Sequence, residues 1–255
     1  MPCPAVPTSA VTTTGEAITR PTGATRATVA LRQPAQRRRG HLCVDRGAGG
    51  GDFEQAAAVP LCGVTALVLR IMAPLTPADE ALLKAFADQW NIQWWLQTKG
   101  PETAAPYYPK DKELYYTLPE FGVRMPFKPV DFTQVNHMIN RVLVSTALRL
   151  LDVQPQHRVA DLFCGLGNFT LPLATRSREV VGIEGSTALT ERALDNARAN
   201  GLSDKTSFET RNLFDVTTED LVALGKFYRM LIDPPRDGAM ALAQALAGLR
   251  ASHPE

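Results

Sequence analysis

The sequence lacks the features of a membrane or secreted protein. Nowhere do 18 apolar residues follow one another, so we expect no membrane-spanning helix. The first residues do not combine a positively charged stretch with an apolar one, so no secretory signal is predicted and we expect a cytoplasmic protein. Cysteines are few and far apart, without a C-x-x-C pair: Cys3, Cys43, Cys62 and Cys164. Neither a disulfide framework nor a zinc site is therefore predicted, and we expect no bound metal.

The chain carries almost no net charge. The 27 basic and 26 acidic residues give a formal net charge of +1, so no global positive field indicates nucleic acid, and any basic surface must be local. With 45% hydrophobic residues, the 255-residue chain can bury a sizeable core as one large or two smaller domains. A soluble globular protein is the expectation.

Residues 1–62 have a biased composition. They include no Lys, Trp or Tyr and a single Phe, Phe53, and they show no sustained period of 2 or 3.6 residues. We predict that this segment is mostly disordered and assign no domain to it. The basic run Arg37 to Arg39 is open to two interpretations, a nucleic-acid-binding arm or a solvated charge cluster, and we favour the second.

Residues 63–130 are typical of a small α/β subdomain. The stretch VTALVLRI from Val64 predicts a strand, and Thr76 followed by Pro77 and Asp79 predicts the start of a helix. The segment NIQWWLQT predicts a second strand, which completes a β-α-β unit. A hairpin with Gly122 near its turn is expected next.

Residues 131–255 predict a doubly wound parallel sheet. A helix over about 134–151 places apolar residues at helical spacing, which suits packing on a core: Val135, Met138, Ile139, Val142, Leu143 and Leu150. Strands and helices then alternate through RVADLF, EVVGIE, TSFET and FYRMLID. In such a sheet the ligand lies beyond the carboxyl ends of the strands, where Gly165 and Gly167 fall.

The glycine-rich turn is built to approach a ligand. Gly165 and Gly167 let the backbone turn tightly and expose amides at a helix N-terminus. A dinucleotide fingerprint would have Gly or Ala where this chain has Thr170, so nicotinamide binding is disfavoured. Glu184, 19 residues after Gly165, ends the next strand, where its carboxylate can accept both hydroxyls of a ribose. Asp233 ends the fourth strand.

Five motifs carry a resemblance to a known family. From about residue 65 the chain resembles the 23S rRNA (uracil-5-)-methyltransferases of the RlmD/RumA type, within the RNA uracil-5 methyltransferase family. The motifs are DFTQVN (Asp131 to Asn136), ADLFCGLGNFTLPLA (Ala160 to Ala174), VVGIEGS (Val180 to Ser186), ARANGL (Ala197 to Leu202) and LIDPPRDG (Leu231 to Gly238). The DFTQVN and LFCGLGNF pair favours the rRNA branch over the tRNA branch. The resemblance implies a class I S-adenosylmethionine-dependent methyltransferase fold, with 23S rRNA as partner, and we expect a monomer.

The resemblance also implies which residues bind S-adenosylmethionine. Carried over motif by motif, they are Gln134, Phe163, Asn168, Glu184, Asn212 and Asp233. Gln134 would offer its amide to the methionine end, Glu184 would hold the ribose and Asn212 would approach the adenine. Simpler interpretations stay open for three of them, because Phe163 could belong to the core, Asn212 to a turn, and the sequence DPP could merely end a strand.

The implied reaction needs a cysteine thiolate that adds to C6 of uracil, so that C5 can attack a methyl group, and a base that removes the C5 proton. In the family both residues follow DPPR, and by that pattern they would lie beyond Glu255, so no catalytic residue is assigned and methyl transfer by this chain is not expected. Cys164 lies in the predicted cofactor turn and is interpreted as a small loop residue. The family's iron–sulfur cysteines and RNA-binding β-barrel have no counterpart here, so no cluster is expected.

RNA binding has two interpretations in the segment between Trp90 and Lys128, where aromatic and basic residues interleave. They could stack on bases and contact phosphates, or the aromatics could be core and the lysines solvated. The residues are Trp94, Lys99, Tyr107, Tyr108, Lys110, Lys112, Tyr115, Tyr116 and Arg124. Two other functions remain open for the whole chain: a methyltransferase acting on a small molecule, and an RNA-binding module without catalysis.

Overall fold

The computed structural model describes residues 27–29, 41–42, 44–46, 53–61, 64–134 and 136–252. They form two compact units, which meet in sequence between Lys112 and Glu113. The expected boundary near residue 130 therefore differs from the observed one. The hairpin that we placed in the first subdomain belongs to the second unit, where Arg124 of the hairpin and Asn200 exchange two hydrogen bonds.

The first unit is a five-stranded sheet with one long helix. Its strand order is β2-β4-β5-β6-β7, in which β5 and β6 are parallel and the other pairs antiparallel. The sheet elements are β2 (His41–Leu42), β4 (Phe53–Leu61), β5 (Val64–Ile71), β6 (Ile92–Gln97) and β7 (Ala105–Tyr108). A separate antiparallel pair joins β1 (Ala27–Val29) to β3 (Val44–Arg46). Strand β4 lies in the range 1–62 for which we predicted disorder, whereas the RRR run lies outside the described residues.

Helix α1 (Pro77–Trp90) begins where its sequence predicts. Thr76 and Asp79 form a capping box, in which each side chain accepts a hydrogen bond from the other residue's backbone amide. Pro77 occupies the first turn, and Asn91 ends the helix with a left-handed backbone. The helix packs Ala87 against β5 and β6, so this β-α-β unit is confirmed.

The second unit contains a parallel four-stranded sheet preceded by a hairpin. The sheet has the order β12-β11-β10-β13, with all three pairs parallel. Its strands are β10 (Arg158–Leu162), β11 (Glu179–Glu184), β12 (Thr206–Thr210) and β13 (Arg229–Ile232), and the hairpin is β8 (Tyr115–Leu118) and β9 (Val123–Pro126). The chain first moves from β10 to β12 and then returns to the other side of β10, so a switch point lies at the carboxyl end of β10. The predicted doubly wound sheet is confirmed.

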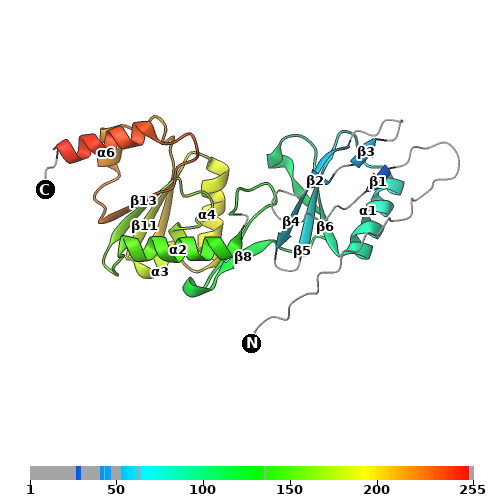
Figure 1. The fold of residues 1–255 in the computed structure, drawn as a ribbon, viewed down its shortest axis with the longest axis horizontal. Coiled ribbons are helices and arrows are strands. Elements are labelled where there is room, and N and C mark those ends of the chain that lie inside the picture. The colour runs from blue at the N-terminus through cyan, green and yellow to red at the C-terminus, as the bar shows by residue number, and fades with distance from the viewer. Residues whose placement is uncertain are drawn as a thin grey trace. The chain divides into compact units, whose positions relative to one another are not determined.

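Helices cover both faces of this sheet, and Figure 1 shows its strands between α2 and α6. The helices are α2 (His137–Leu151), α3 (Thr170–Arg176), α4 (Thr187–Ala199), α5 (Thr218–Ala223) and α6 (Met240–Ser252). On one face, Ala160 and Leu162 of β10 pack with Leu221 of α5 and Leu242 of α6. Because side chains alternate along a strand, Asp161 faces the opposite layer. The sequence did not predict α5 or α6.

The face that α2 buries differs from our prediction. The helix buries Asn140, Val144 and Leu148, which lie four residues apart on one stripe. The apolar residues that we assigned to the core are exposed, except Val135, which lies outside the described residues: Met138, Ile139, Val142, Leu143 and Leu150. Helix α2 is apolar on two faces, and the neighbouring α3 and β13 decide which of them is buried.

Candidate functional site

The glycine-rich turn between β10 and α3 has an unusual backbone. Phe163, Gly165 and Gly167 all have positive φ angles, of 65°, 55° and 95°. A left-handed backbone favours glycine, and a bulky aromatic residue in this conformation is rare. A Cβ added at Gly165 would meet no described heavy atom within 4 Å, so this side of the turn is open. The predicted glycine-rich turn is therefore present, with Phe163 held in a strained conformation, while its role in facing a ligand stays a prediction.

Glu184 forms hydrogen bonds with this turn and with the turn that follows β11. Its carboxylate accepts hydrogen bonds from the backbone amides of Gly165 and Ser186, both at 3.1 Å. The amides of Phe163 and Cys164 donate to the carbonyl of Ile183, which fixes the turn to the end of β11. A carboxylate has about four acceptor positions, so two remain on Glu184 for hydroxyl donors.

Asp161 carries a buried carboxyl group that no sequence motif indicated as a site residue. It is 1% exposed, and its Oδ2 accepts a hydrogen bond from the Thr170 hydroxyl at 2.5 Å. Its Oδ1 has no hydrogen-bond partner among the described residues. Burial, assisted by the charges of Asp233 and Glu184 and opposed by the hydrogen bonds with Thr170, raises the pKa of Asp161 to about 7. It lies within the apolar strand β10, so only its position two residues before Phe163, where the turn begins, could have indicated it.

Asn168 lies in the turn with its side chain in a hydrogen-bond network. Its Oδ1 accepts from the Tyr116 hydroxyl at 2.8 Å and from Asn140 Nδ2 at 2.9 Å. Its own Nδ2 donates to Asn140 Oδ1 at 3.0 Å. The position in the turn is as predicted, but most of the side chain's hydrogen-bonding capacity is used within the protein.

The DFTQVN segment has two structural residues around Gln134. Asp131 pairs with Arg192 of α4 at 3.3 Å and accepts from the Lys128 amide. Asn136 caps α2 by accepting from the amides of Met138 and Ile139. Gln134 lies half-buried in the short loop between these two anchors. Its role as a cofactor ligand stays a prediction.

Asn212 lies in the loop after β12 and forms a local turn. Its Oδ1 accepts from the Phe214 amide at 3.0 Å, and its Nδ2 donates to Asp215. The ring of Phe214 contacts that of Phe163 edge to face, with centroids 5.7 Å apart. The loop thus lies next to the glycine-rich turn, although the Asn212 side chain itself is committed to its own turn.

Asp233 is exposed and directly follows β13. Its predicted position at the end of the fourth strand is confirmed, and its amide donates to the carbonyl of Leu162 at 3.4 Å, which places it beside the carboxyl end of β10. Asp161 of β10 therefore lies near Glu184 at the end of β11 and Asp233 just after β13, and both of these carboxyl groups interact with it electrostatically.

Cys164 is buried within the turn, with 5% of its surface exposed. Burial raises the pKa of its thiol, and the nearby charges of Asp161 and Glu184 raise it further. A nucleophilic cysteine needs the opposite environment, so the geometry agrees with a small loop residue.

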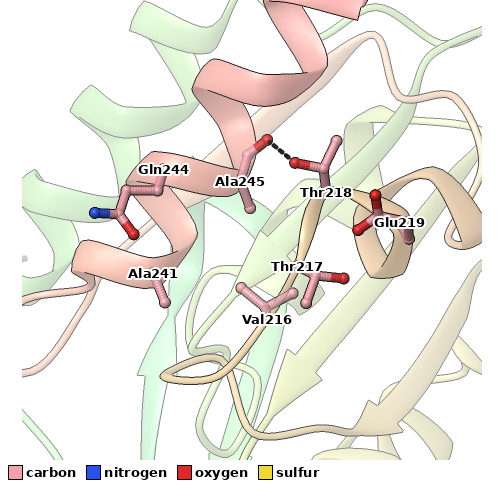
Figure 2. Close-up of a pocket in the computed structure, with 7 residues that line it drawn as sticks. All are labelled: Val216, Thr217, Thr218, Glu219, Ala241, Gln244 and Ala245. Carbon is pink, nitrogen blue, oxygen red and sulfur yellow. Dashed lines mark hydrogen bonds between the residues drawn. The ribbon is translucent and has the colours of Figure 1, made fainter.

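An open pocket of about 290 Å³ lies between α5 and α6. Figure 2 shows Thr218 beside it, with its hydroxyl bonded to the carbonyl of Ala245. One carboxylate, Glu219, lines this pocket, and none of the six predicted cofactor residues does. The pocket therefore offers no set of converging reactive groups.

The interleaved aromatic and basic residues are divided between the two units, and two of the aromatic side chains are buried. Trp94 and Tyr116 are both 4% exposed and belong to the cores of different units. Arg124 lies over the ring of Tyr115, with 3.8 Å to the centroid, and pairs with Glu113. For Trp94 and Tyr116 the core interpretation holds.

Comparisons with known proteins identify the family and the fold. A family model described as tRNA (uracil-5-)-methyltransferase matches residues 118–245. The chain is 70% identical over 186 residues to the 23S rRNA (uracil(1939)-C(5))-methyltransferase RlmD of Cupriavidus pinatubonensis, covering 73% of this chain and 40% of that protein. It is 68% identical over 189 residues to the protein of the same name from Ralstonia pickettii, covering 74% and 42%. The chain thus spans about two fifths of the length of these relatives.

Among solved structures, the chain is similar to the Pyrococcus abyssi tRNA (uracil-54, C5)-methyltransferase in complex with S-adenosyl-L-homocysteine. The TM-score is 0.56 at 19% identity, over 77% of this chain and 47% of that one, so this likeness concerns the fold. No helix in the described part of the chain is long and apolar enough to span a membrane. The fold is that of a class I S-adenosylmethionine-dependent methyltransferase, and the chain belongs to the tRNA (uracil-5-)-methyltransferase family.

Proposed function

We propose that this chain binds S-adenosylmethionine at the carboxyl ends of β10, β11 and β13 and serves the methylation of uracil C5 in 23S rRNA. The observation that carries the rRNA assignment is the 70% identity to a protein named for that reaction, over 73% of this chain. The predicted cofactor residues are Gln134, Phe163, Asn168, Glu184, Asn212 and Asp233. Cytoplasmic location and a monomeric state remain part of this proposal.

The residues present suit such a cofactor. S-adenosylmethionine carries a sulfonium and an ammonium group, and the carboxylates of Glu184 and Asp233 at this edge provide complementary negative charge. Asp161 Oδ1 is buried without a partner among the described residues, which is costly unless a ligand or water completes it. Glu184 retains acceptor positions for ribose hydroxyls, and the Phe163–Phe214 pair supplies an apolar wall for a purine.

The chemistry divides between the cofactor and the protein. When bound, S-adenosylmethionine supplies an electrophilic methyl group. Glu184 and the turn orient the cofactor, while the aromatic pair excludes water from one side. Uracil C5 becomes nucleophilic only after a thiolate adds to C6, and the buried Cys164 is a poor source of that thiolate. We therefore assign cofactor binding to the described residues and no catalytic residue among them.

Two measurements test the proposal. Calorimetry with S-adenosylhomocysteine should show binding by the 255-residue chain, and absence of binding would refute the cofactor assignment. Tritium transfer from labelled S-adenosylmethionine to unmodified 23S rRNA should be absent for this chain alone. Turnover that Cys164→Ala abolishes would instead make Cys164 the nucleophile.

The same experiments separate the alternatives. An RNA-binding module without catalysis would retain 23S rRNA in a gel-shift assay while failing to bind S-adenosylhomocysteine. A small-molecule methyltransferase would transfer the labelled methyl group to an acceptor in an RNA-free extract. Either result would favour the corresponding alternative over the proposed function.

A further inference from the structure

A reciprocal pair of side-chain amides joins the glycine-rich turn to α2. Asn140 Nδ2 donates to Asn168 Oδ1 at 2.9 Å, and Asn168 Nδ2 donates to Asn140 Oδ1 at 3.0 Å. Asn140 is 1% exposed and lies on the buried stripe of α2 among aliphatic residues. An amide at such a core position is costly unless its hydrogen bonds are made, and the reciprocal pair makes them.

The hairpin supplies a third member of this network. Tyr116 of β8 is 4% exposed, and its hydroxyl donates to Asn168 Oδ1 at 2.8 Å. The Tyr116 ring contacts the rings of Phe127 and His137, with centroid separations of 6.1 and 5.5 Å. Burial raises the pKa of this phenol, so the hydroxyl stays protonated and can donate at any working pH.

The hydrogen-bonding capacity of Asn168 is thereby almost exhausted. A side-chain amide has two acceptor positions and two donor hydrogens. Tyr116 and Asn140 fill both acceptor positions on Oδ1, and Asn140 accepts one of the two Nδ2 hydrogens. One Nδ2 hydrogen is left over, so Asn168 can offer a ligand a donor and has no acceptor to offer.

We propose that Tyr116 and Asn140 are positioning residues for cofactor binding, which hold the Asn168 amide in one orientation so that its remaining Nδ2 hydrogen is presented to an oxygen of the cofactor. This inference rests on the proposed function, since it takes the turn to be the cofactor site. The bound group must be an acceptor, such as the methionine carboxylate or a ribose oxygen, because the ammonium group would need an acceptor from Asn168. The cost of orienting the amide is met during folding and not on binding.

The test is a double-mutant cycle on the 255-residue chain, with S-adenosylhomocysteine affinity as the readout. Tyr116→Phe removes one hydroxyl and keeps the ring, and we expect the Kd to rise about 3- to 10-fold. In an Asn168→Ala background, where there is no amide to orient, the same substitution should change the Kd less than twofold. Tyr228→Phe is the matched control, because this exposed tyrosine stacks on His157 away from the network.

The cycle distinguishes positioning from structural support. A merely structural Tyr116 would weaken binding equally with and without Asn168, and this result would overturn the inference. So would an unchanged Kd for Tyr116→Phe while Glu184→Ala still weakens binding, although the proposed function would then stand. Absence of binding by the unmodified chain would refute the proposed function and the inference together. Asn140→Asp keeps an acceptor and loses the donor to Oδ1, so it should weaken binding by a similar factor.

Discussion

The Glu184 carboxylate and the Gly165 amide are joined by a hydrogen bond of 3.1 Å across the carboxyl ends of β11 and β10. The same carboxylate accepts from Ser186, so a single side chain fixes two consecutive turns. Glu184 was predicted as a ligand for ribose, and the structure adds that it also shapes the loop that would surround that ribose.

Glu184→Ala should weaken S-adenosylhomocysteine binding by about 1.5 to 3 kcal/mol, the range of hydrogen bonds to a charged group. Calorimetry measures the loss, and circular dichroism checks that the variant is folded. Glu191→Ala removes an exposed carboxylate from α4 and should leave the Kd unchanged. Equal affinities for Glu184→Ala and the unmodified chain would remove Glu184 from the site.

Asp161→Asn should change how the stability of the chain depends on pH. Folding raises the pKa of Asp161 from 3.8 to about 7, so the native state holds a proton that the unfolded state has lost between these values. The contribution of this group to the free energy of unfolding is therefore full below pH 3.8 and falls until about pH 7. An asparagine can still accept from Thr170 and does not titrate.

The free energy of unfolding of Asp161→Asn minus that of the unmodified chain should therefore be larger at pH 8 than at pH 5. Urea unfolding of both proteins at the two pH values gives this difference. A stability difference that is the same at both values would mean that Asp161 does not carry the raised pKa.

Leu148→Ala and Leu150→Ala test which face α2 buries. Leu148 is 7% exposed and Leu150 is 77% exposed, although they are two residues apart. Truncating the buried leucine should lower the free energy of unfolding by about 2 to 5 kcal/mol. Truncating the exposed one should change it by less than about 0.5 kcal/mol. The reverse order would restore the core face that we first predicted.

Gly182→Ala should destabilise the sheet next to the turn. A Cβ at this position would lie 2.8 Å from the Phe208 ring and 3.0 Å from Cys164 Sγ, both closer than ordinary contacts. Such overpacking costs about 1 to 3 kcal/mol. Thermal unfolding measures it, and an unchanged melting temperature would show that Phe208 can move aside without cost.

Local signals explain which elements could be predicted. The cap at Thr76, the proline that follows it and the apolar run from Val64 act within a few residues, so α1 and β5 were predicted close to their observed bounds. For α2 the helix itself was predicted correctly from the spacing of its apolar residues, but its buried face was predicted wrongly. Both faces are apolar, and only contacts with α3 and β13 select the one that is buried.

In the candidate site, too, local signals locate some residues and miss others. Glu184 and Asp233 follow from the position at which a strand ends, which periodicity locates. The partners of Asn168 could not be found, because Tyr116 lies 52 residues away in sequence and no local rule connects the two. Asp161 was missed since a single acidic residue in an apolar strand carries no periodic signal.

Asn200, just after α4, covers part of the edge of the hairpin at which strands from other molecules could pair. Its side-chain amide accepts from the Arg124 amide at 2.9 Å and donates to the Arg124 carbonyl at 2.7 Å. These are the two bonds that an added strand would make with β9 at that residue. Unprotected strand edges recruit other strands and promote aggregation. At Arg124 the side chain of Asn200 occupies the backbone groups that such a strand would need. A strand from another molecule therefore cannot pair with β9 at this residue.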